Sequence, residues 1–178
     1  MDAVQAFRDH SLNPEHPHSR GSHENGDIFF QHREACNPVY DELPSIVESY
    51  MNKINAKLGS DYGLFNYYGA EDAEDILIGM GSVTGAVQET VDTLNKQGKK
   101  TGYIQVHLYR PFSLPHFTQA LPKTVKRITV LDRTKEPGAL GEPLYEDVCA
   151  AIRHTDLSPE IFACRYGLSS KDVSPASI

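Results

Sequence analysis

The basic residues that follow two predicted strands are the first candidates for a binding site. Arg133 and Lys135 come directly after a predicted strand at residues 127–132, and Arg110 follows another at residues 103–108. Open α/β sheets place their binding crevices at the carboxyl ends of parallel strands, so these three cations could hold an anion or contact a neighbouring domain. The alternative is a solvated loop with locally paired charges. Of the two functional interpretations, domain contact is favoured over a ligand.

A glycine-rich turn is the second candidate. The sequence GMGSVTG at residues 79–85 joins a predicted strand to a helix that we expect to begin at Ser82 as its N-cap. Backbone N–H groups at such a turn can bind phosphate. The third glycine comes one residue later than in the dinucleotide fingerprint, and no acidic residue completes a ribose site. A tight structural turn is therefore favoured over a nucleotide site.

The cysteine, histidine and serine residues indicate no catalytic or metal site. The three cysteines are far apart and form no C-x-x-C pair, which argues against a zinc ribbon or an iron–sulfur cluster within this chain. Ser113 is interpreted as a helix cap and His107 as a packed strand residue, so no nucleophile–base pair is visible. Five histidines in the N-terminal region resemble no metal motif: His10, His16, His18, His23 and His32. No catalytic, cofactor-binding or metal residue is assigned.

The elements that would position these residues follow from hydrophobic spacing. Residues 1–38 show no sustained period and predict an extended arm, whereas residues 39–60 predict a linking helix that ends at Gly59. Beyond it, strands are predicted at residues 64–68, 76–79, 103–108, 127–132 and 161–165, with helices from Ser82 to Gly98, from Ser113 to Ala120 and from Leu144 to Arg153. Such alternation indicates an α/β domain with right-handed crossovers over residues 61–178.

The first strand breaks the parallel scheme. Only residues 69–74 separate it from the second strand. A parallel crossover needs a dozen or more residues, so we expect the first strand to run antiparallel to the others. The sheet is therefore predicted to be mixed.

Composition argues against two classes of partner. The 178 residues carry a formal net charge of −7, whereas nucleic-acid binding needs a clustered excess of Lys and Arg. No apolar run is long enough to cross a bilayer, and the N-terminus lacks the layout of a signal peptide. We expect a cytoplasmic protein, free of nucleic acid and membrane, with its thiols reduced.

Several longer phrases resemble one family. They are NPEHP at residues 13–17, DIFFQ at 27–31, LFNYYGA at 64–70, HLYRPF at 107–112, LDRTKEPGALGEPLY at 131–145 and RYGLSSKD at 165–172. In this order and at about these separations they resemble pyruvate:ferredoxin (flavodoxin) oxidoreductases over nearly the whole chain. The sequence departs from the family at residues 22–26 and at Cys164, where glycine is frequent. Neither departure touches a cofactor motif.

The resemblance implies a fold and a place in a larger protein. Residues 1–38 would be the tail of the first domain, residues 39–60 the linking helix, and residues 61–178 a domain similar to the C-terminal domain of transketolase. That domain is a three-layer α/β/α sandwich with a five-stranded mixed sheet in the order 1-3-2-4-5, in which strand 1 is antiparallel. The family continues where this chain stops at Ile178, which suggests a fragment.

The resemblance also implies an activity for the parent enzyme. It would decarboxylate pyruvate oxidatively to acetyl-CoA with thiamine diphosphate, magnesium and three 4Fe–4S clusters, using coenzyme A and passing electrons to ferredoxin or flavodoxin. This piece carries none of those cofactor motifs, so it would be scaffold and inter-domain interface, in contact with the remaining domains and inactive alone. Two alternatives stay open: a free-standing α/β module that binds a small anion or nucleotide, and an interaction protein whose arm wraps a partner.

Overall fold

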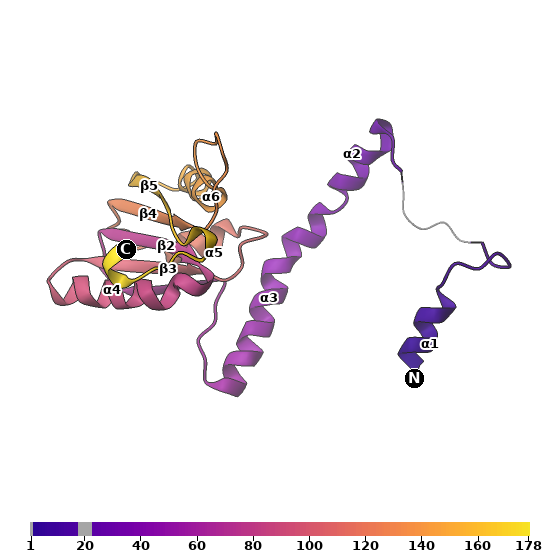
Figure 1. The fold of residues 1–178 in the computed structure, drawn as a ribbon, viewed down its shortest axis with the longest axis horizontal. Coiled ribbons are helices and arrows are strands. Elements are labelled where there is room, and N and C mark those ends of the chain that lie inside the picture. Colours follow the sequence, from indigo (N-terminus) through magenta and orange to yellow (C-terminus); the bar gives the residue numbers. More distant parts are fainter. Residues whose placement is uncertain (1, 18–22) are drawn as a thin grey trace. The chain divides into compact units, whose positions relative to one another are not determined.

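Five short strands form one sheet in the computed structural model, which describes residues 2–17 and 23–178 (Figure 1). They are β1 (Phe65–Gly69), β2 (Asp75–Met80), β3 (Thr101–Val106), β4 (Arg127–Asp132) and β5 (Glu160–Arg165). Their order is β1-β3-β2-β4-β5, and all neighbours pair in parallel except β1, which is antiparallel to β3. The predicted mixed sheet and the reversed first strand are confirmed.

Helices cover both faces of this sheet, which makes three layers. On one face, α5 (Leu114–Ala120) and α6 (Pro143–Ile152) pack on Ile78, Ile104 and Val130. On the other face, α4 (Thr84–Lys96) packs through Val87 and Val91. The segment after β5 contributes two short 3-10 turns, η2 (Leu168–Ser170) and η3 (Pro175–Ser177), and Val173 and Ile178 join the α4 side. The predicted three-layer sandwich is confirmed.

The connection between β1 and β2 shows why β1 is reversed. Five residues, 70–74, pass under the amino end of β3, where Ala70 N donates to Thr101 O and Glu74 N donates to Lys100 O. Gly69 begins this crossing with φ of +120°, and a Cβ atom there would lie 2.6 Å from Thr101 O. Only glycine fits this conformation and this close approach. A connection this short cannot return to the same edge of the sheet, so β1 runs antiparallel.

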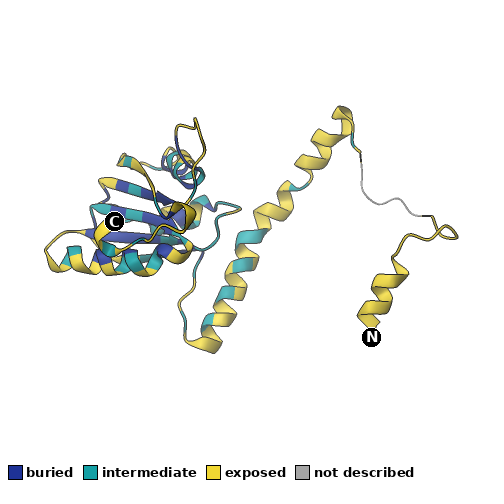
Figure 2. Cartoon of the chain, in the orientation of Figure 1, coloured by how far each residue is buried: buried dark blue, intermediate teal, exposed yellow. Residues whose placement is uncertain are grey.

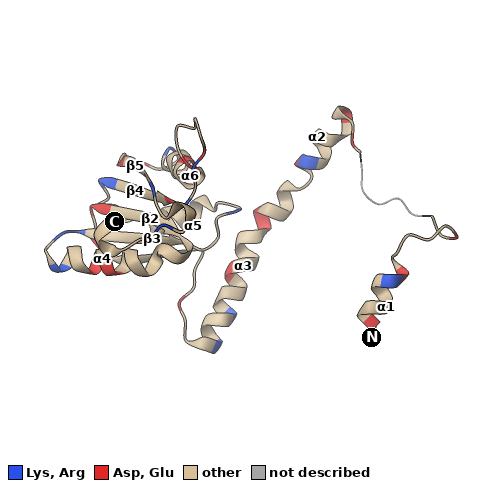
Figure 3. Ribbon diagram, viewed as in Figure 1, with Lys and Arg blue, Asp and Glu red and all other residues tan. Residues whose placement is uncertain are grey.

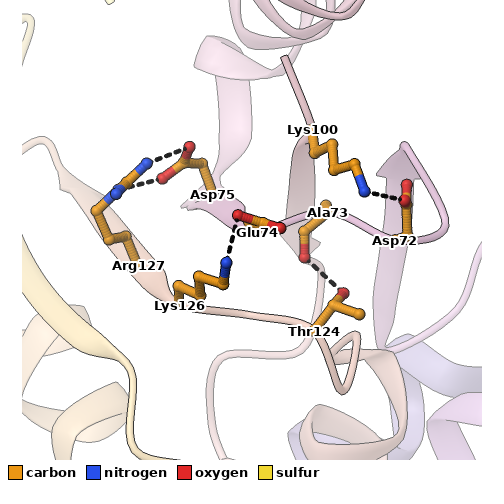
Figure 4. A network of polar contacts seen from close by, with 8 residues as sticks. All are labelled: Asp72, Ala73, Glu74, Asp75, Lys100, Thr124, Lys126 and Arg127. Atoms are coloured by element: carbon orange, nitrogen blue, oxygen red, sulfur yellow. Dashed lines mark hydrogen bonds and ion pairs between the residues drawn. The ribbon is translucent and has the colours of Figure 1, made fainter. Parts of the chain in front are cut away.

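Ion pairs join the loops at the amino ends of the central strands (Figure 4). Asp72 pairs with Lys100 at 2.6 Å and Glu74 pairs with Lys126 at 2.8 Å. Arg127 donates two hydrogen bonds to Asp75, at 2.5 and 2.7 Å. The side-chain hydrogen bond from Lys100 lowers the pKa of Asp72. Acidic and basic side chains alternate along this edge, so each of these charges is paired with an opposite charge within the domain.

The chain divides into two units, residues 1–38 and residues 39–178. In the first unit, α1 (Asp2–Asp9) and α2 (Gly26–Glu34) are helices without a buried residue. The expectation of an extended segment is therefore wrong for these two stretches. Each helix is only eight or nine residues long, so neither shows an apolar period sustained over several turns. His18 lies outside the described residues.

The helix α3 (Asn37–Leu58) reaches into the second unit and ends before Gly59, which has φ of +67°. It begins two residues earlier than the predicted start, and its half-buried Val47 and Met51 pack against the main core. Among the described residues, no helix is both long and apolar enough to cross a membrane.

Candidate functional site

The crevice at the carboxyl ends of β2 and β4 is the candidate site. It has a volume of about 450 Å³, and its wall includes Gly81, Ser82, Tyr109, Arg133, Thr134 and Tyr166. After β2 the chain enters α4 on one face of the sheet, and after β4 it leads to α6 on the other face. Open α/β folds bind ligands at such a switch point, where neighbouring connections diverge.

The glycine turn forms one wall of the crevice. Gly81 has φ of +73°, and residues Gly81–Val83 form a 3-10 turn, η1, before α4 begins. The prediction that Ser82 caps this helix with its side chain is wrong, because α4 begins after Val83 without a side-chain cap. Ser82 Oγ instead accepts a long hydrogen bond of 3.4 Å from Arg133 Nη1. The tight structural turn is present, and its serine faces the basic loop.

Arg133 forms the opposite wall and is the best placed of the three predicted cations. Its Nε donates to the backbone oxygen of Gly167 at 2.9 Å, which connects the loop after β4 to the loop after β5. Arg133 as a whole residue remains exposed and so could still bind a ligand or a neighbouring domain. Burial raises the pKa of Tyr166 in the same wall, so this phenol stays protonated at neutral pH.

Two buried carboxylates shape the loop and were missed from the sequence. Asp132 is 4% exposed and accepts hydrogen bonds from Leu144 N and Tyr145 N, at 3.2 and 3.1 Å, at the start of α6. Glu142 is 1% exposed and accepts from Glu136 N at 2.8 Å and from Arg165 Nη1 at 3.0 Å. Burial raises the pKa of Asp132, although its two backbone donors act in the opposite direction. Both carboxylates position the loop and neither faces solvent.

Arg110 has a different environment. Its Nη1 lies 2.6 Å from Asp147 Oδ2 of α6, and its guanidinium lies 4.0 Å from the centre of the Tyr109 ring. Burial and then the Asp147 carboxylate raise the pKa of Tyr109 to about 12. Arg110 is thus already paired with an acid. Arg110 contacts Asp147, whereas Arg133 contacts Gly167 and Ser82. A shared anion site of Arg110, Arg133 and Lys135 stays a prediction.

Lys135 is exposed and, in the part of the chain that the structure describes, has no ion pair. It lies on the loop whose turn is shaped by Pro137 and Gly138, with φ of +86° at the glycine. An exposed charge without an ion pair adds little to the stability of its own domain. Contact with another domain is therefore the better interpretation of Lys135.

The serine and histidine assignments need one correction. Ser113 occupies the N-cap position of α5 as predicted, but its side chain makes no capping hydrogen bond; its Oγ lies 2.6 Å from His116 Nδ1. His116 Nε2 in turn lies 3.4 Å from Glu48 Oε1. This contact was not predicted, and the absence of a catalytic nucleophile–base pair stays a prediction. The serine is buried, at 9% exposure, and the three-residue spacing places both side chains on the first turn of one helix, so the pair orients α5 against α3.

His107 is packed as expected, but it follows β3, which ends at Val106, rather than lying in the strand. Its ring meets Tyr62 edge to face at 5.6 Å, and burial lowers its pKa.

The thiols present do not fit an iron–sulfur cluster. Cys36, Cys149 and Cys164 are all free, and the described residues contain no group of three His, Cys, Asp or Glu side chains that could hold a metal ion. Such a cluster needs several thiolates that converge on it. We derive no step through a cluster or through thiamine diphosphate in this chain.

Comparison with known proteins identifies the family. Residues 73–178 match the model named pyruvate:ferredoxin oxidoreductase core domain II. The pyruvate-flavodoxin oxidoreductase of Enterobacter agglomerans is 56% identical over 99% of this chain, and the pyruvate:ferredoxin oxidoreductase of Moorella thermoacetica is 50% identical over the same share. This chain spans 15% of the length of each.

A solved structure is also similar. It is the 2-oxoglutarate:ferredoxin oxidoreductase from Magnetococcus marinus with 2-oxoglutarate, coenzyme A and succinyl-CoA bound, which is 22% identical with a TM-score of 0.46. The match covers 74% of this chain and 21% of that one. Since the family model covers more than half of the residues and the sheet has the expected order, the chain belongs to the pyruvate:ferredoxin oxidoreductase family.

Proposed function

We propose that this chain is part of an enzyme that oxidatively decarboxylates pyruvate to acetyl-CoA and passes the electrons to ferredoxin or flavodoxin. The observation that carries the proposal is the identity of 56% over 99% of the chain to a relative named pyruvate-flavodoxin oxidoreductase. The relatives are several times longer, so pyruvate, coenzyme A and the electron acceptor would meet other parts of the polypeptide.

Within that enzyme, this piece acts as scaffold and interface. Residues 1–38 belong to the end of the preceding domain, residues 39–60 form the link, and residues 61–178 form the transketolase-like domain. The ordered loop with Arg133 and Lys135 supports an interface role, since Glu142 and Asp132 hold it from beneath. Thiamine diphosphate, magnesium and the three 4Fe–4S clusters would be held elsewhere. We infer a cytoplasmic enzyme, which the three free thiols support.

Activity of the complete polypeptide that contains this sequence tests the proposal. Purified without oxygen, it should reduce flavodoxin or ferredoxin when pyruvate and coenzyme A are both present. The 178-residue chain alone should give no turnover under the same conditions. Reduction with 2-oxoglutarate but not with pyruvate would show that the substrate is wrong. Turnover by the chain alone would show that the division of labour is wrong.

The second candidate function is binding of a small anion or nucleotide at the switch-point crevice. The observation in its favour is that Ser82, Arg133 and Thr134 line one hollow of about 450 Å³ at the carboxyl edge of the sheet. Isothermal titration of the chain with coenzyme A, acetyl-CoA and phosphate separates this candidate from a scaffold, which should give no heat. If heat is observed, Arg133→Ala should abolish it while Arg153→Ala, on the exposed end of α6, should not.

A further inference from the structure

The helix α3 carries more apolar surface than its own domain covers. One side of α3 is held on the domain: Val47 and Met51 pack against the main core. Polar contacts fix the same side, because Glu48 approaches His116 and Asn55 bonds to the backbone N and O of Tyr62, both at 2.8 Å. These contacts determine which side chains of α3 face away from the domain.

A second row of large apolar side chains runs along α3 beside the packed side. It is called the outer stripe and consists of Ile46, Tyr50, Ile54 and Leu58. Their exposed fractions are 46%, 60%, 44% and 74%. Residues four apart lie one above the other on a helix, so the outer stripe is continuous and about 18 Å long at about 1.5 Å per residue.

Single exposed apolar residues are common on protein surfaces, but a contiguous row is not. A helix whose apolar arc is wider than one neighbour can cover is buried on more than one side in the finished assembly. Figure 2 shows that α3 is exposed along the side that the domain does not cover. The outer stripe therefore lacks its partner within residues 39–178.

Charges beside the outer stripe limit the chemistry of that partner. Lys53 Nζ lies 4.5 Å from the centre of the Tyr50 ring, and Lys57 lies in the last turn of α3. In Figure 3 the C-terminal end of α3 is accordingly blue. A complementary surface would be apolar along its centre and would carry carboxylates opposite the last two turns.

We propose that the outer stripe of α3 packs against another domain of the same polypeptide, through an apolar face bordered by carboxylates. The proposal rests on the proposed function, in which this chain is one part of a longer enzyme. The curated relatives support a partner within the polypeptide, because the aligned stretch makes up 15% of their length and the remainder supplies ample surface. The alternative partner, a second copy of this chain, is an outcome of the test.

The test places a charge on the outer stripe in the complete polypeptide, with the same charge elsewhere on α3 as control. Ile54→Glu lies in the outer stripe, whereas Ala56→Glu lies on the exposed side of the same helix turn. In the 178-residue chain, both variants should unfold within about 3 °C of the wild type, since both positions are already exposed. In the complete polypeptide, Ile54→Glu should increase the rate of limited proteolysis about α3 roughly tenfold, and Ala56→Glu should not.

The milder Ile54→Ser, which adds no charge, keeps the test decisive if Ile54→Glu fails to fold in the complete polypeptide. It should increase cleavage by a smaller factor in the same region. Unchanged cleavage in both Ile54 variants would overturn the proposal. So would dimerisation of the wild-type 178-residue chain that Ile54→Glu abolishes, because the partner would then be a second copy. If the wild-type complete polypeptide shows no pyruvate turnover, the proposed function is wrong. The cleavage experiment would still show whether the outer stripe is covered by another domain.

Discussion

Glu142 Oε1 accepts a hydrogen bond from Arg165 Nη1 at 3.0 Å, which joins the loop after β4 to the last residue of the edge strand β5. The other carboxylate oxygen accepts from Glu136 N, so both oxygens of a side chain that is 1% exposed have partners. A buried charge is tolerated when it is paired and hydrogen-bonded. Glu142 thus connects the loop after β4, residues 133–142, to the edge strand β5.

Arg165→Ala should therefore destabilise the domain by about 1–3 kcal/mol, because it leaves a buried carboxylate with one partner fewer. The value is below that of a fully buried pair, since the arginine side chain is 44% exposed. Urea unfolding of the 178-residue chain measures it.

The matched control for Arg165 is Arg153→Ala, which removes an exposed arginine at the end of α6 and should change stability by less than about 0.5 kcal/mol. A double-mutant cycle with Glu142→Gln should show a coupling energy of about 0.5–3 kcal/mol. Additive effects of the two substitutions would contradict a direct interaction.

Gly69→Ala should be among the most damaging single changes in the sheet. The new Cβ would lie 2.6 Å from Thr101 O in a backbone with φ of +120°, so strain and overlap add. We expect a loss of about 2–4 kcal/mol in the free energy of unfolding. Gly85→Ala is the matched control, because it lies in α4 with nothing within 4 Å of the added atom. Gly85→Ala should raise the free energy of unfolding by about 0.5–1 kcal/mol. Equal losses of stability at both glycines would contradict the close approach of Gly69 to the start of β3.

The order of elements could be predicted from the sequence because hydrophobic periods and helix ends are local signals. The short interval between β1 and β2 even predicted the reversal of β1. The strand order came only from the resemblance, since a sheet order depends on contacts between residues far apart. The two helices before residue 38 were not predicted: both are only eight or nine residues long, and the i, i+3 pair Val4 and Phe7 in α1 is too short a pattern to establish a helical period.

The candidate site was predicted less completely than the fold. Arg133 and Lys135 stood out by charge and by their place after a strand. Asp132 and Glu142 looked like ordinary acids in a charged loop, although their partners make them the buried supports of that loop. The partner of Glu142 lies 23 residues away at Arg165, and no spacing rule connects the two. One signal in the sequence could have indicated their role: Asp132 ends the predicted strand, and Glu142 directly precedes Pro143 at the start of the next helix.

Protonation of His107 should destabilise the domain at acid pH. Burial lowers its pKa below the usual value, so as the pH falls through about 6.5 the unfolded chain binds a proton before the folded chain does. Stability is therefore full above that pH and declines below it. The wild-type melting temperature should fall more between pH 7 and pH 5 than that of His107→Gln. His154→Gln, at an exposed position, should retain the wild-type decline; an unchanged decline in His107→Gln would rule out this residue as the cause.

Arg133 and Lys135 should matter more in the complete polypeptide than in this chain. In the 178-residue chain, Lys135→Ala should change stability by less than about 0.5 kcal/mol because the side chain is solvated. Arg133→Ala should cost about 1 kcal/mol, since it removes the hydrogen bond from Nε to Gly167 O. If the loop meets another domain, the double variant should lower turnover or assembly of the complete polypeptide, measured by pyruvate-dependent flavodoxin reduction and by gel filtration. Full activity with unchanged thermal stability would mean that the loop is a solvated connection between β4 and α6.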